Sequence, residues 1–178
     1  RSSLYGHIAL SPQATDDSEK QEATPQLVST GISDVKPLAA DAADWTSYRG
    51  GNARNDLSAV KIPSAVKLDW TTDITLSDLP TAPVVAGGFV FVADRTGTVH
   101  AFDRSGKRVW KSYTAGPIYY PPAVADGRLF VGSADGRVYA FEAVTGKFLW
   151  SYRVAPQERW IPVFGRLVST WPVSGGVV

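Results

Sequence analysis

The sequence contains no cysteine and no methionine, and it has only two histidines among its 178 residues. The lack of cysteine excludes disulfide bonds, thiol chemistry and a lipobox cysteine within these residues. Two histidines, without cysteine and without a close cluster of carboxylates, provide no metal-binding or hydrolytic constellation. The sequence also lacks any apolar run near the ~18 residues of a transmembrane helix.

The sequence also has no marked excess of positive over negative charge, or of negative over positive charge. The chain has 18 Lys and Arg against 17 Asp and Glu, a net charge of +1, and 44% of its residues are hydrophobic. This is the balance of an ordinary soluble globular protein. It argues against a surface dedicated to nucleic acid or to a membrane.

The sequence does contain an internal repeat, in which one module occurs twice. Its limits are marked by three tryptophans at spacings of 40 residues: Trp70, Trp110 and Trp150. The residues between the tryptophans repeat too, since 82–92 match 121–131 and 96–103 match 135–142. A period of ~40–50 residues is typical of repeat architectures such as β-propellers, which have four strands per blade.

The composition of each module favours strands. Short β-branched and aromatic runs such as Phe89–Val92 and Val138–Phe141 alternate with glycine turns such as Asp126-Gly127 and Asp135-Gly136. Asp-Gly between apolar runs is a strong hairpin signal. No window shows a sustained 3.6-residue period with caps, so we expect no helix here. Each module is predicted to be a four-stranded antiparallel meander, in the first near 83–86, 89–93, 98–103 and 108–114.

The apolar runs also indicate how the meanders pack. Phe89–Val92 does not alternate apolar with polar residues, so both faces of this strand must be covered. Blades stacked face to face would supply that cover. The recurring tryptophan would then lie between neighbouring blades, where a buried aromatic covers ~150–250 Å².

The second module carries a family resemblance. Residues Ala140–Trp150 resemble the Trp-docking repeat of bacterial quinoprotein-like β-propellers, Ala-x-Asp-x-x-Thr-Gly-x-x-x-Trp, and Ala101–Trp110 is the same motif shortened by one residue. This family, the PQQ-repeat or BamB-like propellers, includes dehydrogenases that use pyrroloquinoline quinone (PQQ) and non-catalytic relatives. The resemblance extends over about residues 45–178 and implies structural roles for these residues: Trp70, Trp110, Trp150, Gly106 and Gly146.

We therefore predict an all-β fold, an incomplete propeller over residues 45–178. Two complete four-stranded blades are expected at about 82–114 and 121–154, with the start of a third at about 171–178 and an outer strand at 66–74. Residues 1–44 are expected to be a disordered tail or linker, because 11–25 are polar and small. The missing methionine and the abrupt end predict a fragment, whose partners include the remaining blades of the parent chain.

A candidate binding surface follows from the propeller geometry. Loops that join an outer strand to the next inner strand share one face with the loops between second and third strands. This loop face collects Ser77, Asp78, Asp94, Arg95, Asp135 and, as the candidate site for a protein or small ligand, Tyr119, Tyr120, Arg159 and Trp160. The last two belong to a long irregular loop predicted at 155–170. The competing interpretation is that these aromatics only pack the rim.

Other conspicuous residues have simpler interpretations. His100 on the third strand corresponds to Tyr139 in the second module, which favours packing over metal ligation. Asp126 and Asp135 precede glycines and are read as turn residues. The arginines of the entry segment, residues 45–55, are expected to hydrogen-bond loop carbonyls and clamp the entry, and the alternative is that they bind an anion.

Three hypotheses about the function remain open. The first is a non-catalytic binding or scaffold module, with no cofactor in these residues. The second is a fragment of a PQQ- and calcium-dependent alcohol or sugar dehydrogenase, whose cofactors would be held in the parent chain, because no cysteine pair or calcium set is present here. An enzyme domain before Ser11 is a third alternative. By resemblance the protein is exported, periplasmic or associated with the cell envelope.

Overall fold

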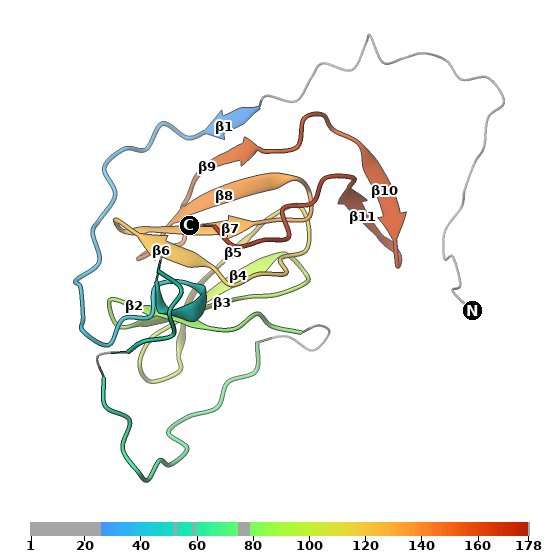
Figure 1. The fold of residues 1–178 in the computed structure, drawn as a ribbon. Coiled ribbons are helices and arrows are strands. Elements are labelled where there is room, and N and C mark those ends of the chain that lie inside the picture. The colour runs from blue at the N-terminus through green and yellow to red at the C-terminus, as the bar shows by residue number, and fades with distance from the viewer. Residues whose placement is uncertain (1–25, 52, 59, 75–78, 178) are drawn as a thin grey trace, which may run out of the picture.

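The computed structural model describes residues 26–51, 53–58, 60–74 and 79–177. Within these ranges the fold is all-β, with one 3-10 turn, η2 (Tyr48–Gly50), as its helical element. The strands form two antiparallel sheets and a separate hairpin (Figure 1). This confirms the predicted all-β partial propeller. No helix in these ranges is long and apolar enough to cross a membrane.

The first blade is a meander of four strands: β2 (Val84–Ala86), β3 (Phe89–Ala93), β4 (Thr98–Phe102) and β5 (Arg108–Tyr113). Each pairs antiparallel with the next along the chain. Glycines occupy the turns at positive φ, including Gly97 at 85° and Gly106 at 80°, where a Cβ would add steric cost. The strands lie within the residues for which the first blade is predicted.

The second blade repeats this pattern with β6 (Ala123–Ala125), β7 (Arg128–Gly132), β8 (Arg137–Glu142) and β9 (Phe148–Arg153). The register shifts at the same place in both blades, between Ala101 and Phe102 and between Ala140 and Phe141. As a result Trp110 lies opposite Ala101, and Trp150 lies opposite Ala140. The sequence repeat is therefore a structural repeat down to the irregularity in the strand pairing.

The second blade gains a fifth strand that we did not predict. Strand β1 (Leu27–Ser29) pairs antiparallel with β9, at its outer edge. The Arg153 N–H donates to the Gln26 carbonyl (2.7 Å), and the Thr30 N–H donates to the Leu149 carbonyl (2.9 Å). The residues of β1 are exposed, so backbone hydrogen bonds rather than burial hold this strand.

The segment after β1 also differs from the predicted disordered linker at 1–44. Of that linker, residues 1–25 lie outside the described residues. Residues 36–44 run along the turns of both blades: the Lys36 N–H donates to Glu142 (3.3 Å), and the Gly87 N–H donates to Asp44 (3.0 Å). Leu38 packs against Gly87 and the core. The prediction of disorder was wrong here because it considered only the polar composition of the segment. The residues that bind it, Glu142 and Gly87, lie far away in the sequence.

The core lies between the two blades. It joins Phe91, Ala101 and Trp110 of the first blade to Leu129 and Phe141 of the second, among other buried residues. The Trp110 ring covers Gly146 so closely that a Cβ there would lie 2.5 Å from it, and Trp110 Nε1 donates to the Ala143 carbonyl (3.0 Å). Trp70 lies against Gly106 in the same manner.

Three further predictions need correction. Residues 66–74 form no strand, because they have no hydrogen-bonded neighbour among the described residues. The long loop at 155–170 contains a regular hairpin, β10 (Trp160–Val163) and β11 (Arg166–Ser169). Residues 171–177, expected to start a third blade, form no strand either, although the Val173 N–H donates to the Ser133 carbonyl (3.0 Å).

The entry segment joins the inner strands of the two blades. Trp45 pairs antiparallel with Val85 of β2, and the Val124 N–H of β6 donates to the Thr46 carbonyl (2.8 Å). The Arg49 guanidinium pairs with the Asp56 carboxylate at 2.5 Å. The expected clamp is thus an ion pair rather than a set of bonds to loop carbonyls.

Candidate functional site

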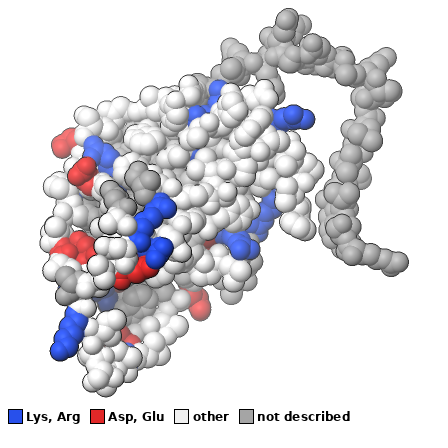
Figure 2. Space-filling view, in the orientation of Figure 1, with Lys and Arg blue, Asp and Glu red and all other residues white. Residues whose placement is uncertain are grey.

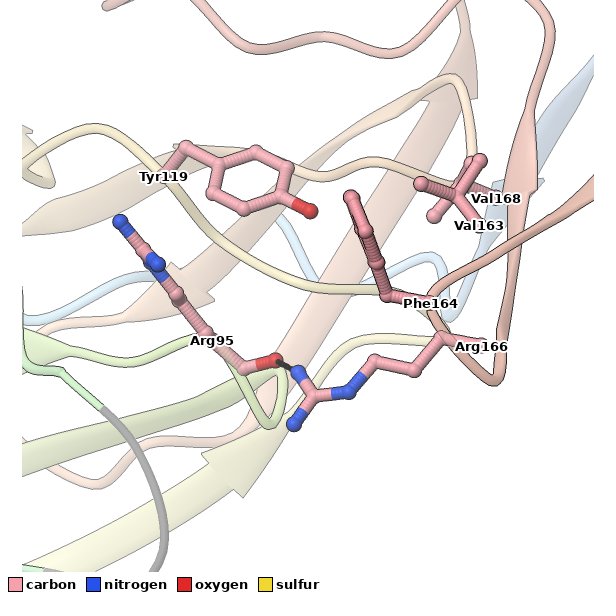
Figure 3. A pocket seen from close by; sticks show the side chains of 6 residues that line it. All are labelled: Arg95, Tyr119, Val163, Phe164, Arg166 and Val168. Carbon is pink, nitrogen blue, oxygen red and sulfur yellow. Dashed lines mark hydrogen bonds between the residues drawn. The ribbon is translucent and has the colours of Figure 1, made fainter. Parts of the chain in front are cut away.

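A cavity opens on the loop face where three segments meet: the β3–β4 turn, the connection between the blades, and the β10–β11 hairpin (Figure 3). Its volume is about 330 Å³. We call it the loop-face cavity, and it is lined by Arg95, Tyr119, Val163, Phe164, Arg166 and Val168.

The β3–β4 turn holds Arg95 in place through its buried neighbour Asp94. Asp94 Oδ1 accepts hydrogen bonds from the N–H groups of Thr96 (2.8 Å) and Thr98 (3.1 Å). Its Oδ2 lies 3.1 Å from His100 Nε2. Burial alone would raise the pKa of Asp94, but the hydrogen bonds from Thr96, His100 and Thr98 outweigh it and lower this pKa below its usual value. These hydrogen bonds hold the turn in one conformation, and they occupy both carboxylate oxygens of Asp94.

Tyr119 faces Arg95 from the connection between the blades. The preceding residue, Ile118, is fully buried, and its N–H donates to the Asp94 carbonyl (3.2 Å). The Arg95 guanidinium carbon lies 5.8 Å from the centre of the Tyr119 ring, within the range of a cation–π contact. Tyr119 remains 44% exposed, so its ring is available to a ligand.

The hairpin supplies the opposite wall. Phe164 and Gly165 form its turn with φ of 47° and 78°. Phe164 is 95% exposed and projects into the cavity region (Figure 3). Arg166 Nη1 donates a hydrogen bond to the Arg95 carbonyl and ties the hairpin to the first blade. The Ser169 N–H donates to the Ala134 carbonyl (2.7 Å), which ties it to the second.

A second cavity adjoins the first. Its volume is about 460 Å³, and it shares both Arg95 and Arg166 with the loop-face cavity. Its other walls are Thr96, Ala115, Gly116, Pro117 and Leu167. The two arginines therefore stand between two hollows.

The four candidate residues do not form one site. Tyr119 lines the cavity, but Tyr120 turns away and stacks edge-on against Tyr48, with ring centres 4.9 Å apart. Arg159 accepts a backbone hydrogen bond from Thr170 (2.9 Å), and Trp160 is 41% exposed on β10. Of the wider set on the loop face, Asp94 and Asp135 are buried, while Ser77 and Asp78 lie outside the described residues.

Sequence reasoning missed the contributions of Phe164 and Arg166. Both residues lie in the segment that was predicted to be an irregular loop, 155–170, so their positions in space could not be predicted. A hairpin signal was present in Phe164-Gly165 between two apolar runs, but Pro162 within the first run weakened it.

His100 and Tyr139 fill equivalent positions with different chemistry. His100 is buried beside Asp94, and its Nδ1 has no hydrogen-bond partner among the described residues. Burial lowers the pKa of His100, and the neighbouring Asp94 opposes that shift only in part. The Tyr139 hydroxyl donates to Asp135, and burial together with this bond raises the pKa of Tyr139. Both side chains serve the β-turn before their strand.

The described residues do not fit a calcium site. Calcium takes 6–8 oxygen ligands, yet the part of the chain that the structure describes contains no group of three or more His, Cys, Asp or Glu that could hold a metal ion.

Comparisons with known proteins agree with the architecture. Solved structures share it at low identity: quinohemoprotein alcohol dehydrogenase ADHIIG of Pseudomonas putida has a TM-score of 0.52 at 22% identity, over 66% of this chain and 20% of that one. A europium-containing methanol dehydrogenase has a TM-score of 0.51 at 19% identity, over 65% and 24%. A quinohemoprotein alcohol dehydrogenase from Comamonas testosteroni has 0.51 at 24%, over 65% and 20%.

This chain spans about a fifth to a quarter of the length of these structures, and the likeness shows the fold alone. No curated protein sequence matches. The family model described as outer membrane protein assembly factor BamB matches residues 45–171, more than half of the chain. The 40-residue repeat, the two stacked blades and this match together show that the chain belongs to that family of PQQ-repeat propellers.

Proposed function

We propose that this region is a non-catalytic binding module that holds a protein or a small ligand through its loop face. The observation that carries the proposal is that the loop-face cavity is built from residues that the repeat does not require. Arg95 stands where the second blade has the fully buried Ala134, and the hairpin has no counterpart in the first blade. Insertions on a rigid repeat scaffold tend to serve binding.

The predicted residues outside the cavity have a place in this proposal. Trp160 is 41% exposed on β10 and would extend the contact area beside the hairpin. Arg159 immediately precedes it, whereas Tyr120 is engaged with Tyr48. The loop-face contact would thus centre on Tyr119, Arg95 and the hairpin.

The tryptophan contacts support a second part of the proposal, in which Trp-docking joins successive blades. Trp110 covers Gly146 of the next blade. The equivalent face of the second blade, around Phe130 and Trp150, borders an apolar cavity of about 260 Å³. We propose that a further blade of the parent chain covers Trp150.

The family's description names the outer membrane, and it supports an exported bacterial protein associated with the cell envelope. Fractionation of cells that produce the full-length protein would test this. Recovery in the cytosolic fraction would contradict it.

The binding function is tested by site-specific photo-crosslinking in the full-length protein. A photoreactive phenylalanine replaces Phe164 in one variant and Tyr113, another exposed aromatic residue, on β5, in the control. We expect a defined adduct at position 164 and none at 113, with the attachment site mapped by mass spectrometry. Equal labelling at both positions, or at neither, would contradict the proposal.

The dehydrogenase alternative is tested separately. The full-length protein is reconstituted with PQQ and calcium, and the reduction of an electron-accepting dye is followed with alcohols and sugars. Dye reduction would overturn the non-catalytic proposal.

A further inference from the structure

We infer that β1 exchanges between two copies of this chain, so that residues 26–30 of each copy pair with the β9 edge of the other. This interaction surface is separate from the loop face, and it does not depend on the function proposed for that face. The way β1 is held, the segment that follows it and the charge around it support the exchange.

Strand β1 is held to the second blade mainly by hydrogen bonds. Each residue of β1 lies opposite a residue of β9, and backbone bonds flank the pair at both ends. The Gln26 side-chain amide donates to the Tyr152 hydroxyl (2.7 Å), and the Thr30 hydroxyl donates to the Leu149 carbonyl (3.0 Å). Residues 26–30 are all exposed, so burial adds little. The same segment of a second copy would make every one of these bonds.

A hinge follows β1. Residues 31–34 are exposed and have no regular secondary structure. Within the described part of the chain, the hydrogen bond of residues 31–35 is the one from the Gly31 N–H to the Ser29 hydroxyl (3.1 Å). The chain is fixed again at Lys36, whose N–H donates to Glu142 (3.3 Å). Fully extended, the hinge spans about 17 Å, so β1 can reach a neighbouring sheet while Lys36 stays in place (Figure 1).

The outer strand of the first blade offers a different edge. No strand pairs with the outer edge of β5 among the residues that the structure describes. Lys111 is exposed on β5 at the position where β9 has the buried Ser151. A lysine on an edge strand discourages pairing with a further strand. The β9 edge is therefore the one that is suited to accept a strand.

The charge around β1 permits two copies to approach each other. The 178 residues carry a net charge of +1, so repulsion between copies is weak. On the face shown in Figure 2, Asp and Glu side chains gather at the left and the lower edge. The upper part, where β1 and β9 lie in the same orientation, is mostly uncharged (Figure 1). Two β9 edges can thus meet without opposing acidic clusters.

Protein concentration decides between the two arrangements. Both contain the same strand pair, but a short tether gives β1 an effective concentration in roughly the millimolar range at its own β9 edge. The exchanged form is therefore a minor one in dilute solution and grows as the concentration rises. Reciprocal exchange fills both edges and closes a two-fold dimer.

The test traps the exchanged form with a disulfide between copies. Leu27 lies opposite Tyr152 in a non-hydrogen-bonded pair, where Cα atoms are about 4.5 Å apart, a separation that a disulfide spans. Both side chains are exposed, and the 178 residues contain no cysteine. Full-length Leu27→Cys protein is mixed with full-length Tyr152→Cys protein, after any cysteine outside these residues has been replaced by serine. The control mixture pairs Leu27→Cys with Tyr113→Cys, at an exposed position on β5.

The two chains carry tags of different mass, and the mixed covalent dimer is quantified after mild oxidation. We expect about tenfold more mixed dimer than in the control, because strand pairing holds the two thiols together, and the amount should rise with protein concentration. Thr30→Pro added to the Leu27→Cys chain should lower the yield to the control level, because it removes a backbone donor of the pair. Thr30→Val keeps this donor and should retain most of the yield. Unaltered thermal unfolding of each variant shows that the blades are intact.

Two results would overturn the inference. A mixed dimer no more abundant than in the control, at every concentration, would show that the β9 edge keeps its own strand or takes one from a different protein. The double variant Leu27→Cys/Tyr152→Cys should form a disulfide within one chain in dilute solution. Its failure to do so would contradict the pairing of β1 with β9 itself.

Discussion

Gly146 shows how a single position sets the approach of two sheets. Its φ is +72°, and a Cβ added there would lie 2.5 Å from the Trp110 ring. Two demands thus meet at one residue: a left-handed backbone and the absence of a side chain. The repeat pattern predicted Gly146 and Trp110 as structural residues, and the contact between them gives that prediction a form that can be tested.

The first test compares Gly146→Ala with Gly165→Ala. Gly165 also has positive φ, at +78°, but nothing lies within 4 Å of a Cβ there. We expect Gly165→Ala to lower the free energy of unfolding by about 1 kcal/mol, the cost of the left-handed backbone. Gly146→Ala should lower it by about 2–4 kcal/mol, because overpacking against Trp110 is added. Urea unfolding measures both, and equal costs would show that the Trp110 contact is unimportant.

The second test concerns the hydrogen bond of the same tryptophan. Trp110→Phe keeps an aromatic ring but removes the Nε1 donor to the Ala143 carbonyl, in a buried place. We expect a loss of about 1–3 kcal/mol in the free energy of unfolding, the cost of an unsatisfied buried acceptor. Trp160→Phe on the exposed β10 is the control and should change it by no more than about 0.5 kcal/mol. Similar effects at both positions would argue against the bond.

Among the strands, β1 is the one that we expect to be least stably held. Its residues are exposed, and it contributes to the sheet through backbone bonds at the edge of β9. An edge strand offers unpaired N–H and C=O groups to any extended segment nearby. Here residues 26–30 of the same chain occupy that edge.

Thr30→Pro tests this pairing, because it removes the N–H that donates to the Leu149 carbonyl. We expect β1 to detach and the Arg153 amide, which donates to Gln26, to exchange its hydrogen about tenfold faster. The amides of β8 should keep their protection. Thr30→Val retains the N–H and serves as control. Unchanged exchange at Arg153 in Thr30→Pro would mean that β1 does not protect the edge.

The elements also show what the sequence could predict. The eight strands β2 to β9 follow from apolar runs bounded by glycine turns, which are local signals. Strand β1 has no such signal, since it exists only because the β9 edge accepts it. Residues 66–74 have the composition of a strand but no hydrogen-bonded neighbour strand within the described residues. The hairpin was hidden by Pro162 and by a turn, Phe164-Gly165, that is not among the usual pairs.

The candidate site, like the fold, could be predicted only in part. Tyr119 and Arg95 could be assigned to the loop face from propeller geometry alone. Phe164 and Arg166 could not, because their position depends on the bonds that tie the hairpin to Arg95 and Ala134. Tyr120 stands next to Tyr119 in the chain and yet points elsewhere, toward Tyr48.

For the whole molecule, the pKa shifts predict how stability depends on pH. The pKa of His100 lies below its usual 6.5 because burial, together with repulsion from Arg108 and Lys111, outweighs the raising effect of Asp94. The unfolded chain therefore binds this proton first as the pH falls. The pKa values of Asp94, Asp103 and Glu142 are lowered from 3.8, 3.8 and 4.5, so the unfolded chain also binds these protons first.

We accordingly expect the free energy of unfolding to fall in two steps on acidification, the first below about pH 6.5 and the second below about pH 4.5. His100→Phe should abolish the first step and leave the second. Urea unfolding between pH 7 and pH 3 measures both. His7 lies outside the described residues, and His7→Gln controls for its titration. Persistence of the first step in His100→Phe would assign it to other groups.

The two ways of anchoring the third strand have a consequence for protein engineering. In one blade the acid is at position 94 and its partner is a histidine; in the other the acid is at 135, two places further along the repeat, and its partner is a tyrosine. Exchanging only the ring between repeats would set each ring against a turn whose acid stands at the other position, so the pairing of ring and acid would be lost in both blades. A chimera or a consensus repeat would therefore have to exchange the third strand together with the turn that precedes it.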